Sequence, residues 1–152
     1  MSKKNRQQDP LTLLLMWDKL KEFLTNPNNH LIIRHSNQEK YHYVHNVGIR
    51  HDASHEALHV WSHTGPWFNI HMTAEAGSYY HATKLELVDV DEPAQPSDTI
   101  YPDYTYTACD KTPGVVLKLS FRWNNKDARS IYLYLLSNPS GRDWKKYFSD
   151  GK

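Results

Sequence analysis

Cysteine is nearly absent from this chain of 152 residues, in which Cys109 stands alone. A single cysteine excludes an internal disulfide. Long apolar runs are absent too, because a run such as Leu13 to Trp17 is far below the roughly 18 residues that a membrane-spanning helix needs. This run is also too short for the apolar core of a signal peptide. Together these absences predict a soluble, cytoplasmic protein with no membrane partner.

A strong excess of one charge is missing as well. The formal net charge is +1 with histidine neutral, which excludes a global basic field that would attract nucleic acid. The exception is the N-terminal tip, where Lys3, Lys4 and Arg6 lie in a polar stretch. We predict that residues 1–8 form a flexible basic tail and that residues 9–152 form a single globular domain.

Several motifs of well-known enzyme classes are missing too. The chain has no P-loop, no glycine-rich dinucleotide motif, no cysteine pair spaced for zinc and no serine nucleophile elbow. Histidine, by contrast, is concentrated in one block, since all ten lie between His30 and His81. Histidine titrates near neutral pH, ligates metals and performs acid–base chemistry, so a functional hypothesis has to account for this block.

The first predicted element is an amphipathic helix. Asp9 is a suitable N-cap and Pro10 a suitable first helical residue. Asn26 and Pro27 mark the end of the helix. Apolar side chains recur between them at helical spacing, at Leu13, Met16, Trp17, Leu20, Phe23 and Leu24.

Beyond this helix the apolar period changes to two residues, which is typical of strands. The predicted strands are 30–35, 40–47, 57–63, 67–73, 79–90, 115–123 and 130–137, with a helical turn at 144–148. Residues 91–114 are predicted to form a long loop with a short strand at 104–108. We predict an α+β fold in which the N-terminal amphipathic helix packs on a curved, mostly antiparallel β-sheet. A small β-barrel or a sandwich is the alternative.

The segment His-Glu-Ala-Leu-His at residues 55–59 matches the HExxH pattern. On a helix, His55 and His59 face the same way and bind zinc, while Glu56 activates a water molecule. His63 continues the spacing of four. In these residues the chain resembles zinc metallopeptidases, and the resemblance implies a zinc hydrolase. On a strand the same spacing places the histidines on one solvated or aromatic-packed face, and the sequence leaves both interpretations open.

A second motif is the tripeptide H-x-T, which begins at His71 and again at His81. If the two strands pair antiparallel, His71 faces Thr83 and Thr73 faces His81 on one side of the sheet. This arrangement resembles the two-histidine phosphoesterases, whose paired H-x-T/S motifs lie on neighbouring strands. The resemblance implies acid–base chemistry by His71 and His81, with Thr73 and Thr83 holding phosphoryl oxygens. Ordinary cross-strand packing of histidine on threonine is the alternative.

Alternation in the hairpin that turns at residues 64–66 gathers rings and imidazoles on one face. This face comprises His59, Trp61, His63, Trp67, Asn69, His71 and Thr73, and Tyr79 and His81 extend it onto the next strand. Stacking side chains beside hydrogen-bonding groups are typical of sites that bind bases or nucleotides. On a later strand, Lys118, Ser120 and Arg122 alternate with apolar residues and supply charge for a phosphate.

These patterns favour a domain whose His/Trp/Tyr-rich sheet face binds a nucleotide or a short nucleic acid. Metal-independent phosphodiester cleavage by the histidine pair is the strongest enzymatic version, and no cofactor is expected. A non-catalytic protein-interaction module, including one that self-associates, is the alternative from another class. A zinc hydrolase is the third hypothesis. A small chain without housekeeping motifs also resembles viral accessory proteins, which is an association rather than a physical argument.

Overall fold

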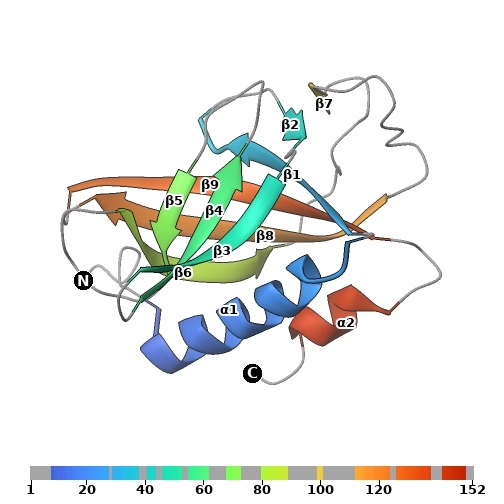
Figure 1. The fold of residues 1–152 in the computed structure, drawn as a ribbon, viewed down its shortest axis with the longest axis horizontal. Helices are drawn as coiled ribbons and strands as arrows, with labels where there is room; N and C mark the ends of the chain where they lie inside the picture. The colour runs from blue at the N-terminus through green and yellow to red at the C-terminus, as the bar shows by residue number, and fades with distance from the viewer. Residues whose placement is uncertain are drawn as a thin grey trace.

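The computed structural model describes residues 8–27, 29–37, 41–43, 46–52, 55–61, 68–72, 80–88, 99–100, 112–123, 126–137 and 142–149. The strands in these ranges form one sheet in the order β3-β4-β5-β6-β8-β9-β1-β2-β7 (Figure 1). Most neighbouring strands are antiparallel, and the sheet order begins at β3 and ends at β7 without closing. The α+β class is confirmed, with a single open sheet in place of a closed or two-sheet arrangement.

One helix lies near each end of the chain, and all the strands lie between them in sequence. In chain order they are α1 (Pro10–Leu24), β1 (His30–His35), β2 (Tyr41–Tyr43), β3 (Asn46–Asp52), β4 (His55–Trp61), β5 (Phe68–His71), β6 (Tyr80–Val88), β7 (Thr99–Ile100), β8 (Thr112–Trp123), β9 (Lys126–Ser137) and α2 (Trp144–Ser149).

Helix α1 begins and ends where local sequence signals predict. The Asp9 carboxylate accepts a hydrogen bond from the backbone N–H of Thr12 at 3.2 Å, and Pro10 occupies the first helical position. Five apolar side chains of the helix are buried and join one hydrophobic cluster with side chains of the strands and of α2: Leu13, Met16, Trp17, Leu20 and Phe23. Burial of each contributes about 1.5–3 kcal/mol to folding.

The longest hairpin, β8–β9, is confirmed from Val115 to Trp123 and from Ser130 to Ser137. Its side chains alternate between two environments. Leu117, Leu119 and Leu133 belong to the main core cluster, which also contains the buried residues of α1 and α2. Strand β1 has the predicted bounds and pairs antiparallel with β9. The antiparallel pairing of β4 with β5 is also as predicted.

The single strand predicted at 40–47 is wrong. The described parts of this segment belong to β2 and β3, which lie far apart in the sheet, because β2 pairs with β1 and β3 pairs with β4. The alternating pattern runs through both strands and does not reveal that the chain changes partners. The short strand predicted at 104–108 lies outside the described residues. Strand β7 lies within the predicted loop 91–114 and pairs parallel with β2, and β8 begins at Thr112, inside that loop.

Gln8 was predicted to belong to the N-terminal tail but is fixed against β6. Its backbone N–H donates to the carbonyl of Thr83 at 2.9 Å, and its side-chain amide exchanges two hydrogen bonds with the backbone of Leu85 at 3.1 and 3.0 Å. The folded part therefore includes this residue. Residues 1–7 of the predicted tail lie outside the described ranges.

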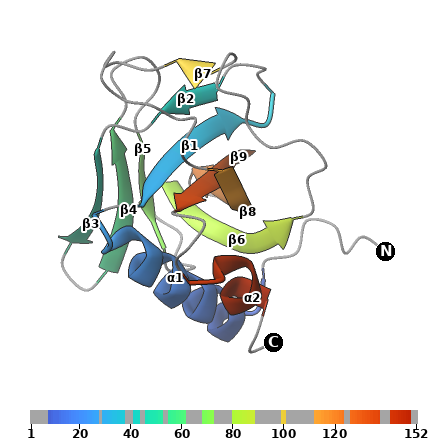
Figure 2. The same cartoon turned by 90° about the vertical axis from the view of Figure 1, so that its right-hand side faces the viewer.

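The two helices lie side by side (Figure 2). The ring of Trp144 meets that of Phe23 edge-on at 5.0 Å between centroids, and the Lys19 ammonium donates to the carbonyl of Tyr147 at 2.9 Å. The predicted turn at 144–148 is confirmed as α2. Among the described residues, neither helix is long and apolar enough to cross a membrane.

Candidate functional site

The sheet has a second face, opposite the cluster that contains the helix side chains, and much of it is polar. The register pairs His81 with Arg122, Lys84 with Ser120 and Glu86 with Lys118 across β6 and β8. We call this side the polar face and define it by nine residues of four adjacent strands: His59, Asn69, His71, His81, Lys84, Glu86, Lys118, Ser120 and Arg122. Their neighbours in sequence, such as Leu85 and Leu119, point into the core.

A pocket of about 370 Å³ opens on β6, β8 and β9. Its lining residues are Ser36, Thr83, Lys84, Glu86, Lys118, Ser120, Phe121, Arg122, Ala128, Arg129 and Ser130. Four of these carry a positive charge and one carries a negative charge, so the described lining favours an anion. The four hydroxyl side chains provide hydrogen-bond donors between the cations.

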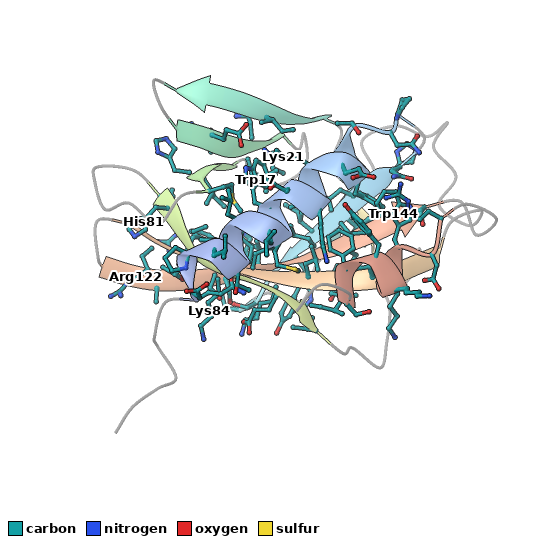
Figure 3. All side chains as sticks on the ribbon, turned by 90° about the horizontal axis from the view of Figure 1, so that it is seen from below. Trp17, Lys21, His81, Lys84, Arg122 and Trp144 are labelled. Carbon is teal, nitrogen blue, oxygen red and sulfur yellow. The ribbon has the colours of Figure 1, made fainter. Side chains whose placement is uncertain are left out.

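His71 and His81 lie next to one another, directly opposite in the register of β5 and β6. Both are buried, with 6% and 3% of their surface exposed. Arg122 continues the same row on β8 and lines the pocket. Figure 3 shows His81, Lys84 and Arg122 toward one end of the molecule, away from Trp144 on α2.

The antiparallel register predicted for the two H-x-T motifs is wrong. Strands β5 and β6 are parallel, so His71 faces His81 and not Thr83. The physical reason is that β6 pairs along its whole length with β8, whereas β5 meets only the start of β6. Thr83 is half-buried and lines the pocket, and Thr73 lies outside the described residues.

Two further predicted residues lie on this face, on the strands β4 and β5. His59 on β4 lies opposite Asn69 on β5, and both are half-buried. The Asn69 side-chain oxygen and the His81 Nδ1 are buried and have no hydrogen-bond partner among the described residues. Buried polar atoms are normally satisfied by protein, water or a ligand, which makes this row a candidate for hydrogen bonds to a ligand.

The zinc interpretation of residues 55–59 is wrong in its geometry, because the segment is strand β4 and not a helix. In a strand, His59 and Glu56 are on opposite faces. Glu56 turns to α1, where it accepts hydrogen bonds from the indole N–H of Trp17 at 2.8 Å and from the Lys21 ammonium at 2.7 Å. It therefore lies on the other side of the sheet from His59 and cannot activate water at a metal bound there.

The contacts of Glu56 also shift the pKa of its partner. Burial by itself lowers the pKa of Lys21, but the hydrogen bonds and charges of Glu56 and Asp18 outweigh it and raise that pKa above 10.5. The salt bridge between Lys21 and Glu56 links α1 to β4.

The remaining predicted site residues lie, wholly or by their side chains, outside the part of the chain that the structure describes. The side chains of His55 and Trp61 lie outside what the structure describes, although their backbones belong to β4. His63, Trp67 and Tyr79 lie outside the described ranges altogether. Among the described residues, no three side chains of His, Cys, Asp or Glu gather into a group that can hold a metal ion.

Sequence reasoning missed Lys84 and Arg129 as lining residues. The signal for Lys84 was present, because it precedes the buried Leu85 in an alternating strand, but its neighbours across β8 and β9 depend on register. Comparisons of the chain with protein-family profiles, with curated proteins and with solved structures give no match.

Proposed function

We propose that the polar face binds a phosphorylated ligand, a nucleotide or a short nucleic acid. The observation that carries this proposal is the pocket lining, in which Lys84, Lys118, Arg122 and Arg129 outnumber the single carboxylate of Glu86. Arginine and lysine are the side chains that bind phosphate, and the interleaved hydroxyls complete the hydrogen bonds of its oxygens. With a net charge of only +1 for the chain, these cations are a local feature and not part of a generally basic surface.

The size of the pocket and its neighbours favour a ligand larger than inorganic phosphate. A volume of about 370 Å³ falls in the range of small-molecule sites. The row of His81, His71 and Asn69 continues from Arg122 across β6 and β5, and its ring nitrogens and amide suit the edge of a base. A phosphate at the cations with the base over this row accounts for both parts of the face.

A titration of a fluorescent adenine nucleotide, followed by anisotropy, tests the proposal. Lys84→Gln and Arg122→Gln each remove one charge-assisted contact, so we expect dissociation constants at least about tenfold higher. Lys145→Gln on the exposed surface of α2 is the matched control, since it removes the same charge outside the pocket and leaves binding unchanged. Equal loss in all three variants, or no binding at millimolar nucleotide, would refute a phosphate site in this pocket.

Phosphodiester cleavage is a second candidate function, favoured by the direct opposition of His71 and His81. One imidazole takes the proton of a ribose 2′-hydroxyl as it attacks phosphorus, and the other imidazole, protonated, gives a proton to the departing 5′-oxygen. The expected reaction cleaves RNA in the presence of EDTA and leaves DNA of the same sequence intact. His81→Ala and His71→Ala should each remove cleavage while the thermal unfolding midpoint stays near that of the wild type; retained cleavage excludes the pair.

The alternative from another class is a protein-interaction module. It draws on three leucines of α1 that are turned away from the core: Leu11, Leu14 and Leu15, with 63%, 45% and 45% of their surface exposed. Clustered exposed apolar side chains are a feature of interaction surfaces. Light scattering on a size-exclusion column separates the two hypotheses, since a monomer that binds nucleotide saturably supports the pocket and a leucine-dependent oligomer without nucleotide binding supports the module.

A further inference from the structure

A row of two cations with one aromatic ring between them adjoins the pocket on the polar side of the sheet. Arg34 on β1 and Lys118 on β8 both lie opposite Tyr132 of β9 in the register. The guanidinium carbon of Arg34 is 4.7 Å from the Tyr132 ring centroid, and the Lys118 ammonium is 5.9 Å from it. Two positive charges therefore flank one aromatic ring across three adjacent strands.

Arg34 is held in place by its own contacts. Its Nε donates to the Tyr134 hydroxyl at 3.4 Å, and its Nη1 donates to the carbonyl of His35 at 3.3 Å. The guanidinium also lies against the Tyr132 ring, so three neighbours fix its plane. A cation that is already positioned loses little side-chain entropy when a ligand binds.

The pocket and this row form one surface. Lys118 belongs to both, and Ser36, two residues after Arg34, lines the pocket. Along β8, Arg122 is four residues from Lys118, which corresponds to about 13 Å. Arg34 lies a further two strand spacings across the sheet, about 9–10 Å from Lys118. One phosphate cannot contact Arg122 and Arg34 together, whereas a chain of phosphates can.

From this geometry we infer that the ligand is a single-stranded oligonucleotide, whose backbone runs from the pocket past Lys118 to Arg34. This inference rests on the proposed phosphate site and specifies its ligand class. Alternating cations and aromatic rings are typical of surfaces that follow a single strand, because cations hold the backbone and planar groups stack on bases. A mononucleotide fills the pocket and leaves Arg34 unused.

A length series tests the inference. The probes are labelled oligothymidylates of one to six nucleotides, titrated into the full chain at constant salt. We expect the wild type to bind the four- to six-nucleotide probes at least about tenfold more tightly than the mononucleotide, since each further phosphate and base adds contacts. Arg34→Gln should remove most of this gain and leave mononucleotide affinity unchanged. Lys145→Gln should keep the full length dependence.

The outcomes separate the inference from the function on which it rests. If no probe binds, the phosphate site itself is refuted. If all lengths bind equally, or if Arg34→Gln weakens the mononucleotide as much as the longest probe, the pocket stands and the extension along β8, β9 and β1 is overturned. Tripolyphosphate that competes as well as the longest probe overturns the assignment to nucleic acid. Arg34→Lys, which keeps the charge, serves if Arg34→Gln does not fold, and an intermediate length dependence supports the inference.

Discussion

At the scale of single residues, Glu56 shows how a motif can suggest one role while its contacts support another. Its carboxylate accepts hydrogen bonds from the Trp17 indole and from the Lys21 ammonium, which ties β4 to α1. Its side chain is 29% exposed, so the salt bridge to Lys21 is better shielded from solvent than a pair at the surface. A metallopeptidase-like pattern is thus explained by a structural salt bridge.

Removal of this carboxylate should destabilise the fold. In Glu56→Ala the indole N–H of the buried Trp17 loses its acceptor and the Lys21 ammonium keeps only Asp18, and we expect a loss of about 1–3 kcal/mol in the free energy of unfolding. Asp18→Ala is the control, because Asp18 also lies 3.2 Å from Lys21 but its side chain is 55% exposed. We expect it to cost less than about 1 kcal/mol. Urea unfolding followed by tryptophan fluorescence measures both, and equal losses would contradict this ranking.

At the scale of elements, the sequence predicts well wherever the signal is local. Helix α1 carries its own cap and a helical apolar period, and the hairpin β8–β9 has its turn between two alternating runs. The segment at β4 could not be decided in this way. Residues four apart share a face in both a helix and a strand, so the spacing of His55 and His59 fits either structure.

The sequence did not predict which strands pair with one another in the sheet. Strand β6 follows β5 closely in the chain, which suggests a hairpin, yet the two are parallel because β6 takes its direction from β8. Likewise, the alternating sequence over β2 and β3 predicts one strand, but the two pair at distant places in the sheet.

The same dependence on strand pairing applies to the candidate site. Alternation correctly indicates which residues of each strand are polar, as for Ser120 on β8. It does not indicate that Lys84, Ser120 and Ser130 form one row, since that depends on the register of three strands distant in sequence. Some lining residues of the pocket were therefore predictable from the sequence, but their position next to one another was not.

At the scale of the whole molecule, the two ends of the chain hold each other. Helix α1 near the N-terminus and α2 near the C-terminus are joined by the Glu22 carboxylate, which accepts hydrogen bonds from Arg142 and from the Tyr147 hydroxyl, the latter at 2.9 Å. The Arg142 guanidinium also lies over the rings of Trp144 and Tyr147, at 4.7 and 4.9 Å from their centroids. The pKa shifts within this cluster predict that the stability of the fold depends on pH.

The sign of that dependence follows from Glu22. The hydrogen bonds from Arg142 and then from Tyr147 lower its pKa below 4.5, and the small burial of the carboxylate only partly opposes them. A lowered pKa in the folded state means that the contribution is complete above pH 4.5 and disappears as the pH falls through the folded-state value. At the alkaline end, burial and then the hydrogen bond to Glu22 raise the pKa of Tyr147 above 10.0, so its contribution is present below that pH and is lost above it.

A double-mutant cycle tests this link between the helices. The single substitution Arg142→Gln is not sufficient, because it also removes the contacts of Arg142 with the rings of Trp144 and Tyr147. The cycle combines Glu22→Gln and Arg142→Gln and isolates the energy that depends on both side chains. We expect a small stabilising coupling in urea unfolding at about pH 7, since the pair is exposed, and a decline toward zero once acid protonates Glu22. A coupling that is absent at neutral pH, or one that persists unchanged in acid, would show that the charge pair of Glu22 and Arg142 does not contribute to holding the two helices together.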